Sequence, residues 1–155
     1  MSSDTFLSGF KVRCIEPRDL PVVKKLHEEF FPVRYQDEFY DFAVQGVGMR
    51  GMPLYSRIII TDDASEEIVG FVLAQFLDTE FCEERSLFYG SVRAEPSQLF
   101  YILTLGVKRE YRNRGLATAL VEGCSEYASA NLECGLVRII LISKFSVYTY
   151  PFSLG

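Results

Sequence analysis

One stretch decides the fold: Tyr101-Ile-Leu-Thr-Leu-Gly-Val-Lys-Arg-Glu-Tyr-Arg-Asn-Arg-Gly-Leu-Ala-Thr118. It belongs to the clearest strand signal of the chain, the apolar run from Leu99 to Val107. A short basic turn follows. From Leu116 onward, apolar residues recur at helical spacing, which predicts a helix from about Gly115 to Ala130. The stretch therefore predicts a buried strand, a turn and a helix that opens at a glycine.

Outward from this stretch, the same periodicities predict a mixed set of helices and strands. Asp19 is a good N-cap and Pro32 a stop for a first helix, and a second helix is expected over 37–44. We expect a turn between two strands at 62–67 and a long surface loop at 78–98, and residues 144–155 show no clear pattern. Further strands are expected over 10–15, 55–61, 68–77 and 136–143.

Length and composition restrict the class of protein. The chain has 155 residues, of which 48% are hydrophobic and 24% charged, as in a single globular domain. No apolar run approaches the ~18 residues of a membrane helix, and the first residues lack the basic region of a signal peptide. We therefore expect a soluble, cytoplasmic protein. The formal net charge of −5 argues against a nucleic-acid partner.

Cysteine and histidine are too few and too scattered for a metal site. The four cysteines, at positions 14, 82, 124 and 134, lack metal-ligand spacing, so we expect no metal and free, mostly buried thiols. His27 is the only histidine, and we expect it on the surface of the first helix. Residues 46–51 match the Gly-x-Gly-x-x-Gly dinucleotide pattern. A helix before them and Pro53 after them favour a loop instead.

The basic turn is a candidate phosphate site. Residues 108–114 contain four basic residues and one acidic residue, although the whole chain is acidic. Helix N-termini leave N–H groups unpaired and carry partial positive charge. Residues 112–118 can thus form a nest for a pyrophosphate, with Gly115 allowing close approach of the backbone. The Gly-Lys-Ser/Thr ending of a P-loop is absent. The alternative is an ordinary helix start with solvated arginines.

Two motifs resemble a known family. Arg112-Asn-Arg-Gly115-Leu-Ala117 resembles the Arg-x-x-Gly-x-Gly/Ala signature of the GNAT acetyltransferase superfamily, which binds the pyrophosphate of acetyl-CoA. Phe31-Pro32-Val33-Arg34-Tyr35 resembles the Phe-Pro-Val/Ile-x-Tyr substrate loop of N-terminal protein acetyltransferases of the NatE and NatF types. The long loop at 78–98 is most similar to the plant NatF form.

This resemblance implies an α/β (α+β) GNAT acyltransferase fold, a mixed central sheet flanked by helices, with the C-terminal strands missing. The GNAT domain is expected over 10–143, between an N-terminal tail (1–9) and an unrelated C-terminal tail (144–155). The implied activity is transfer of acetyl from the co-substrate acetyl-CoA to the N-terminal α-amine of proteins, typically Met-starting. The partners are then protein or peptide N-termini.

The resemblance also implies roles for individual residues. Tyr101 corresponds to a catalytic tyrosine, although without the resemblance it is more simply a core aromatic residue. Backbone groups of Leu105, Gly106 and Val107 are expected to line the pantetheine. The pyrophosphate is expected at Arg112, Asn113, Arg114, Gly115, Leu116, Ala117 and Thr118. The substrate pocket is expected to comprise Phe31, Pro32, Val33, Tyr35 and Leu103.

The chain departs from this family near its end. The family's second catalytic residue is a histidine in a Tyr-Leu-His-Val strand, but here the corresponding stretch is Val137-Arg-Ile-Ile-Leu141. The closing strands, and the C-terminal extension that attaches NatF enzymes to Golgi membranes, are not recognisable. We therefore expect a truncated product with impaired activity and an exposed sheet edge. Two alternatives remain open: a non-catalytic acetyl-CoA-binding or partner-binding fragment, and a small-molecule acetyltransferase. The oligomeric state is left open.

Overall fold

A computed structural model describes residues 7–31, 34–48, 51–78, 98–131, 138–143 and 146–151. Six strands, three α-helices and two short 3-10 helices alternate along these residues. In chain order they are β1 (Phe10–Cys14), η1 (Pro17–Asp19), α1 (Leu20–Phe30), α2 (Asp37–Gln45), β2 (Leu54–Thr61), β3 (Ile68–Asp78), β4 (Gln98–Val107), η5 (Arg109–Tyr111), α3 (Leu116–Asn131), β5 (Arg138–Ser143) and β6 (Ser146–Pro151).

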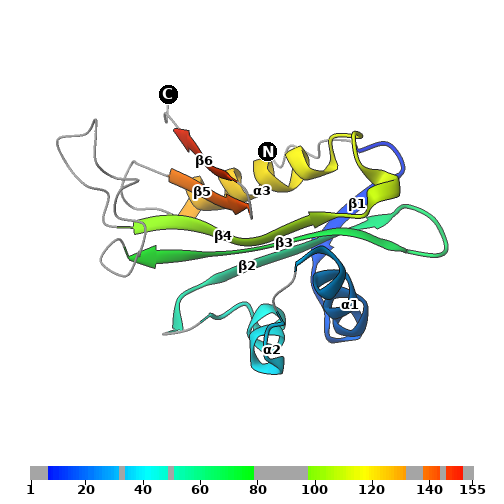
Figure 1. Cartoon of the computed structure of the whole chain (residues 1–155), viewed down its shortest axis with the longest axis horizontal. Helices are drawn as coiled ribbons and strands as arrows, with labels where there is room; N and C mark the ends of the chain where they lie inside the picture. The colour runs from blue at the N-terminus through cyan, green and yellow to red at the C-terminus, as the bar shows by residue number, and fades with distance from the viewer. Residues whose placement is uncertain are drawn as a thin grey trace.

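The strands form one sheet in the order of the sequence, from β1 to β6. Neighbouring strands are antiparallel except β4 and β5, which are parallel and are joined through α3. A parallel pair needs such a crossover because the chain must return to the same end of the sheet. Figure 1 shows the resulting layers, with α1 and α2 below the sheet and α3 above it.

Each face of the sheet has its own hydrophobic core. The core under α3 includes Phe100, Leu116 and Leu120, and the core against α1 and α2 includes Val23, Ile58 and Phe71; all six are at most 2% exposed. Strands covered on both faces read as continuous apolar runs. This explains why β2, β3 and β4 are nearly uniformly hydrophobic in sequence.

Local signals mark the ends of the helices. Asp19 stands at the N-cap of α1 as expected, but its side chain makes no capping hydrogen bond and accepts instead from Arg13 and from the Glu16 N–H. Pro21 lies in the first turn of α1, which ends at Phe30. Gly46 ends α2 in the left-handed conformation, with φ of 72°, and its N–H donates to the Phe42 carbonyl at 2.9 Å. Because α2 precedes Gly46 and β2 begins at Leu54, the glycine pattern at 46–51 lacks the strand–helix context of a dinucleotide site.

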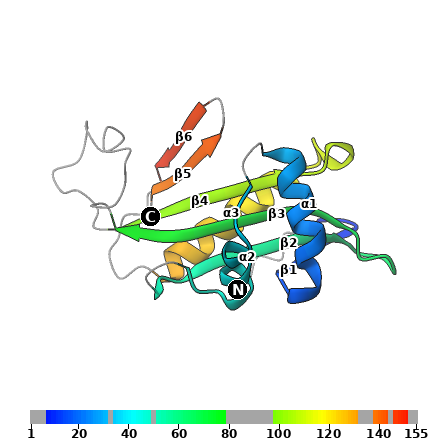
Figure 2. The same cartoon turned by 60° about the horizontal axis from the view of Figure 1, so that its bottom comes forward.

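Two expectations for the C-terminal region are wrong. Residues 146–151, where the sequence shows no clear pattern, form β6. β6 pairs antiparallel with β5 over the whole of that strand, from Arg138↔Pro151 to Ser143↔Ser146. The edge of β5 that we expected to be exposed is therefore paired, and Figure 2 shows the two strands as one hairpin. The predicted loop at 78–98 lies almost entirely outside the described residues.

Candidate functional site

The central strand β4 separates from its parallel neighbour partway along its length. β3 pairs with β4 from Gln98 to Val107, but β5 pairs only with Phe100, Tyr101 and Ile102. Within the described residues, the β5-facing edge of β4 is therefore left without a strand from Leu103 to Val107. Backbone N–H and C=O groups on such an edge are available to a ligand, apart from the Val107 carbonyl, which accepts a hydrogen bond from Arg112.

A β-bulge lies where this opening begins. Leu73 pairs with Thr104 and Ala74 pairs with Ile102, so Leu103 has no residue opposite it on β3. One extra residue reverses the faces to which the following side chains point. Ile102 and Val107 accordingly both belong to the core under α3, whereas Gly106 faces α1. A Cβ atom at Gly106 would lie 2.6 Å from Cδ2 of Phe30, so only glycine fits beneath this ring.

Beyond β4, the backbone forms the predicted nest. Asn113 and Gly115 have left-handed conformations, with φ of 62° and 78°. The first N–H to donate into α3 is that of Ala119, which reaches the Gly115 carbonyl at 3.0 Å. The N–H groups of residues 116–118 precede it and have no partner within the helix. Left-handed residues beside a helix N-terminus make a concave set of donors that suits an anion.

The two arginines of the nest have defined positions. The Nε of Arg112 donates to the Val107 carbonyl at 3.0 Å, and its guanidinium lies 5.8 Å from the centre of the Phe30 ring. Arg114 lies over the Tyr111 ring at 5.4 Å. Both side chains belong to exposed residues. Positive charge at a helix N-terminus opposes the helix dipole, so this arrangement favours a bound anion.

A carboxylate from the hairpin between β2 and β3 holds the segment that enters the nest. Glu67 accepts a 2.7 Å hydrogen bond from the Nζ of Lys108 and a 3.0 Å hydrogen bond from the Tyr111 hydroxyl. These bonds, that of Lys108 first, hold the pKa of the Glu67 carboxyl below its usual range. Lys108 also donates its backbone N–H to the Val69 carbonyl at 2.8 Å. The charge of Lys108 is therefore paired, and the exposed positive charge of this region lies on arginines.

Tyr101 and Leu103 lie on β4 on either side of the start of the opening. Both are partly buried, and Leu103 packs against the core of the α1 face. In the sheet, Tyr101 is paired with Gln75 of β3 and with Ile140 of β5. Neither β5 nor β6 contains a histidine. The structure thus places Tyr101 beside the opening, with isoleucine as its neighbour on the next strand.

Of the four residues that the motif at 31–35 assigns to the substrate pocket, two can be placed. Phe31 and Tyr35 are described and partly buried, whereas Pro32 and Val33 lie outside the described residues. The rings of Phe31 and Tyr35 both contact His27, with centroids 5.6 Å and 5.3 Å from its imidazole. This side of α1 is therefore an aromatic cluster centred on a histidine.

The expectation that His27 is a surface residue is wrong. His27 is 1% exposed, because α2 and β3 cover the side of α1 that carries it. Its Nδ1 lies 2.9 Å from the Tyr40 hydroxyl, and its Nε2 has no hydrogen-bond partner among the described residues. Burial lowers the pKa of this imidazole to about 4. His27 is consequently neutral at physiological pH.

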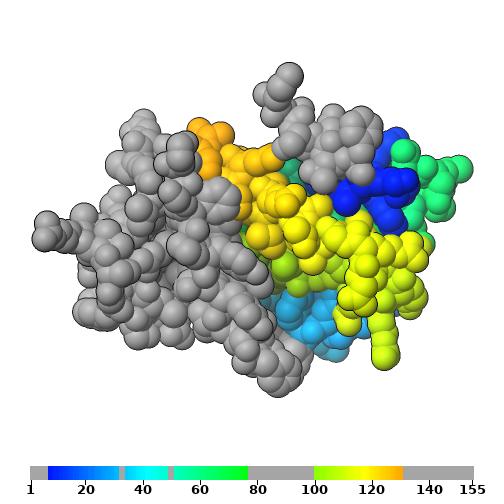
Figure 3. Space-filling view, turned by 90° about the horizontal axis from the view of Figure 1, so that it is seen from above, coloured from blue at the N-terminus to red at the C-terminus, as the bar shows by residue number. Residues whose placement is uncertain are grey.

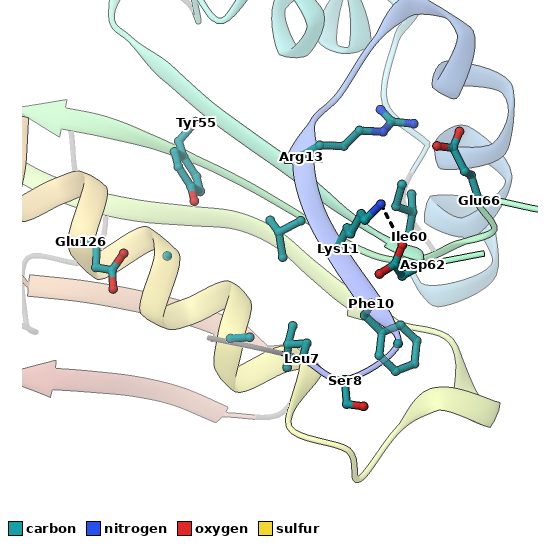
Figure 4. A pocket seen from close by; sticks show the side chains of 14 residues that line it. Leu7, Ser8, Phe10, Lys11, Arg13, Tyr55, Ile60, Asp62, Glu66 and Glu126 are labelled. Atoms are coloured by element: carbon teal, nitrogen blue, oxygen red, sulfur yellow. Dashed lines mark ion pairs between the residues drawn. The ribbon is translucent and has the colours of Figure 1, made fainter. Parts of the chain in front are cut away.

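The cysteines and a groove beside β1 lie outside this site. Cys124 is buried as expected, Cys14 is exposed, and Cys82 and Cys134 lie outside the described residues. A groove of about 700 Å³ lies between β1 and α3, bordered by Tyr55, Gly123 and the Lys11–Asp62 ion pair (Figure 4). Figure 3 shows α3 along this surface, with the start of β1 and the turn after β4 near its N-terminal end.

Comparison with known protein families identifies the family to which the chain belongs. The sequence profile described as the acetyltransferase (GNAT) family matches residues 20–145. The chain belongs to the GNAT acetyltransferase family. Its α+β architecture is the GNAT fold, as the resemblance at 112–117 implies. Within the described part of the chain, no cluster of three or more His, Cys, Asp or Glu side chains is arranged to hold a metal ion.

Two curated relatives show which acetyltransferases this chain is similar to. A protein named histone acetyltransferase MCC1 from Arabidopsis thaliana is 38% identical over 132 residues, which cover 84% of this chain and 53% of that protein. N-alpha-acetyltransferase 60 from Danio rerio is 26% identical over 130 residues, 83% of this chain and 50% of that protein. The chain thus spans about half the length of these GNAT relatives.

Solved structures agree with this placement. A crystal structure of Arabidopsis thaliana NAA60 with a bisubstrate analogue matches with a TM-score of 0.68 and 31% identity, over 88% of this chain and 76% of that one. The complex of the same protein with acetyl-CoA matches with a TM-score of 0.67 and 33% identity, over 86% and 75% of the chains. No helix in the described residues of this GNAT chain has the length and hydrophobicity needed to cross a membrane.

Proposed function

We propose that this chain transfers an acetyl group from acetyl-CoA to the N-terminal α-amine of proteins, with Met-starting chains as the expected substrates. The observation that carries the proposal is the combined likeness to NAA60 structures holding acetyl-CoA and a bisubstrate analogue. The strand, nest and helix from Tyr101 to Thr118 supply matching features in this chain. The substrate motif at 31–35 adds the expectation of a peptide.

The co-substrate fits the geometry of β4 and the nest. We assign the free edge of β4 at Leu105, Gly106 and Val107 to the amide groups of the pantetheine arm. The pyrophosphate then lies at the nest formed by residues 112–118, where the left-handed Gly115 has no atom within 4 Å of an added Cβ. Backbone donors and exposed arginines there complement two adjacent negative charges.

Acetylation of an α-amine depends only modestly on a general base from the protein. The α-amine must be neutral to attack the thioester, and with a pKa of about 7.7–8.0 roughly a tenth to a quarter of it is neutral near pH 7.2. Tyr101 can relay the proton through water, and a backbone N–H of β4 can stabilise the oxyanion. General-base catalysis contributes about 10²–10⁴-fold, so the absence of the family's histidine predicts weak turnover.

A second candidate follows from the 38% identity to a protein named histone acetyltransferase MCC1: acetylation of a lysine side chain. With a pKa near 10.4, only about one lysine amine in a thousand is neutral near pH 7.2, so this reaction depends more on a general base. No histidine lies on β5 to serve as one. The α-amine is therefore the favoured acceptor.

Calorimetry with acetyl-CoA tests the co-substrate site first. The wild-type chain should bind, and Arg112→Glu and Gly115→Glu should each abolish binding by placing negative charge at the nest. Absence of binding by a folded wild-type chain would refute the assignment. If the folded variants bound acetyl-CoA as tightly as the wild-type chain, the co-substrate would not lie at the nest.

An acetylation assay then separates the acceptors. A Met-starting peptide without lysine and an N-terminally blocked histone peptide with lysines are offered under the same conditions. Acetylation of the first alone supports the proposal, and acetylation of the second alone supports the second candidate. Binding of acetyl-CoA with neither product would identify a non-catalytic fragment. Preference for small amines would identify a small-molecule acetyltransferase.

A further inference from the structure

One carboxylate connects two parts of the chain that are far apart in sequence. Glu67 closes the hairpin between β2 and β3, and it accepts hydrogen bonds from residues 41 and 44 positions later in the chain. Those residues, Lys108 and Tyr111, form the segment between β4 and the phosphate nest. The family motif at 112–117 does not include Glu67, and nothing in the sequence around it indicates a contact with the nest.

We propose that Glu67 is a positioning residue for acetyl-CoA, which acts by fixing Lys108 and Tyr111 so that the nest at 112–118 keeps its shape before the co-substrate arrives. This inference rests on the proposed co-substrate site and names a residue that controls it. A site that is already in its binding geometry loses less conformational freedom on binding.

The contacts of Tyr111 show how the effect reaches the nest. Its hydroxyl is held by Glu67, its ring meets Phe10 edge-on at 5.8 Å, and its backbone N–H donates to the Lys108 carbonyl at 2.9 Å. The guanidinium of Arg114 lies over the same ring at 5.4 Å. Glu67 therefore orients Tyr111, and Tyr111 orients a charged residue of the nest.

Stability alone is a poor explanation for this arrangement. The side chains of Glu67 and Lys108 are 42% and 24% exposed. Ion pairs with this exposure contribute little to folding because water and salt screen them. Two bonds from one segment to one carboxylate do, however, fix the orientation of that segment, since both oxygens are engaged.

Simple electrostatics predicts the opposite result, which makes the inference testable. Glu67 is negative and lies near a site for a polyanion, so removing its charge should tighten acetyl-CoA binding if only long-range repulsion matters. Removing it should weaken binding if the positioning of Lys108 and Tyr111 matters. The sign of the change in acetyl-CoA affinity therefore distinguishes long-range repulsion from positioning.

The experiment compares Glu67→Gln with Glu66→Gln, which removes the same charge from the neighbouring residue of the hairpin. Glu66 lines the groove beside β1 (Figure 4), and within the described residues no hydrogen bond or ion pair joins its side chain to residues 108–111. Tyr111→Phe removes only the hydroxyl, and the double variant Glu67→Gln/Tyr111→Phe closes a thermodynamic cycle. The dissociation constant for acetyl-CoA is measured by calorimetry, and KM for both substrates, kcat and the melting temperature are measured on the same samples.

We expect Glu67→Gln to weaken acetyl-CoA binding roughly three- to tenfold, as for loss of one ordinary hydrogen bond, because the glutamine can still accept from one of the two donors. KM for acetyl-CoA should rise in parallel, with kcat, KM for the peptide and the melting temperature unchanged. Tyr111→Phe should also weaken acetyl-CoA binding. The double variant should bind acetyl-CoA no more weakly than the single variant that has the lower affinity. Glu66→Gln should bind as the wild type does, or slightly more tightly.

Unchanged or tighter binding by folded Glu67→Gln would overturn the inference, as would strict additivity in the cycle. A lower melting temperature with unchanged affinity would also overturn it, because Glu67 would then serve stability alone. Failure of the proposed function is a different result. In that case the wild-type chain itself binds no acetyl-CoA, or it binds acetyl-CoA and acetylates no N-terminus.

Discussion

At the residue scale, the most unusual environment belongs to His27. Its imidazole contacts the rings of five aromatic residues and, among the residues that the structure describes, has one hydrogen bond, between Nδ1 and the Tyr40 hydroxyl. The five are Phe31, Tyr35, Phe39, Tyr40 and Phe71. A protonated imidazole would lose its hydration there without gaining a counter-charge. This is the physical cause of its low pKa.

That low pKa predicts how stability depends on pH. Between about pH 4 and 6.5 His27 is protonated in the unfolded chain but neutral in the folded chain. The free energy of unfolding therefore decreases as the pH falls through this range. The expected loss from this group is about 2 kcal/mol at pH 5 relative to neutral pH. Urea unfolding at pH 7.5 and pH 5 measures it. The double variant His27→Phe/Tyr40→Phe removes both polar partners, and an equally steep pH dependence in it would contradict the assignment.

Gly106 is a second residue whose role is set by its neighbours. In Gly106→Ala the new methyl group would lie 2.6 Å from Cδ2 and 3.1 Å from Cε2 of Phe30. Overpacking of this kind costs about 1–3 kcal/mol, which should lower the free energy of unfolding measured in urea. Phe30→Leu opens space beside the methyl group. Gly106→Ala should therefore be less costly in that background, and an equal cost in both backgrounds would show that Phe30 is not the obstacle.

At the scale of single elements, the decisive unit is the end of β4 with the start of α3. The bulge at Leu103 reverses the faces to which the following side chains point. Pairing of β5 with β4 ends at Ile102, and α3 begins just after the left-handed Gly115. Each feature is local, but together they set a free strand edge in line with a helix N-terminus. A long co-substrate with a diphosphate suits both.

Substitutions at Gly115 test the nest as an element. Because no atom lies within 4 Å of an added Cβ, Gly115→Ala meets no clash and costs only the strain of its left-handed φ of 78°, about 1–2 kcal/mol. Asparagine tolerates this conformation better than alanine. We therefore expect Gly115→Asn to retain more stability in urea and tighter acetyl-CoA binding in calorimetry than Gly115→Ala. The reverse order would contradict the left-handed assignment.

At the scale of the whole molecule, the described sheet ends in β1 on one side and β6 on the other. β5 is paired with β4 over only three residues, 100–102 with 139–141, and with β6 over all six of its own. β6 therefore provides most of the backbone pairing that holds β5. It also covers the β5 edge, which could otherwise pair with another chain.

Truncation tests this role of β6. A chain that ends at Ser143 should aggregate at concentrations where a chain that ends at Pro151 remains monodisperse, as measured by light scattering. The second truncation is the matched control, because it also shortens the chain but keeps β6. Equal behaviour of the two chains would show that pairing of β5 with β6 is not what limits solubility.

The sequence alone predicts the elements that depend on neighbouring residues. Helical spacing in α1 and α3, the apolar runs of β2 to β4 and the turn at 62–67 all follow from interactions a few residues apart. The nest at 112–118 is predictable for the same reason, since backbone conformation and helix dipole are local properties. The predicted family is confirmed, whereas the roles assigned to Tyr101, to the pocket residues and to the co-substrate residues 105–107 and 112–118 remain predictions.

What tertiary structure decides is how distant elements cover one another. His27 lies four residues after Val23 and three before Phe30, so helical spacing places it on the buried face of α1, and only its polar side chain suggests the surface. Packing by α2 supplies what the sequence does not show, the Tyr40 hydroxyl as a buried hydrogen-bond partner. Residues 146–151 become a strand because β5 offers them an edge. The contact of Glu67 with Lys108 and Tyr111 joins a hairpin to a turn more than 40 residues away. Sequence periodicity does not encode such contacts, because burial and pairing belong to the surfaces that meet and not to either segment alone.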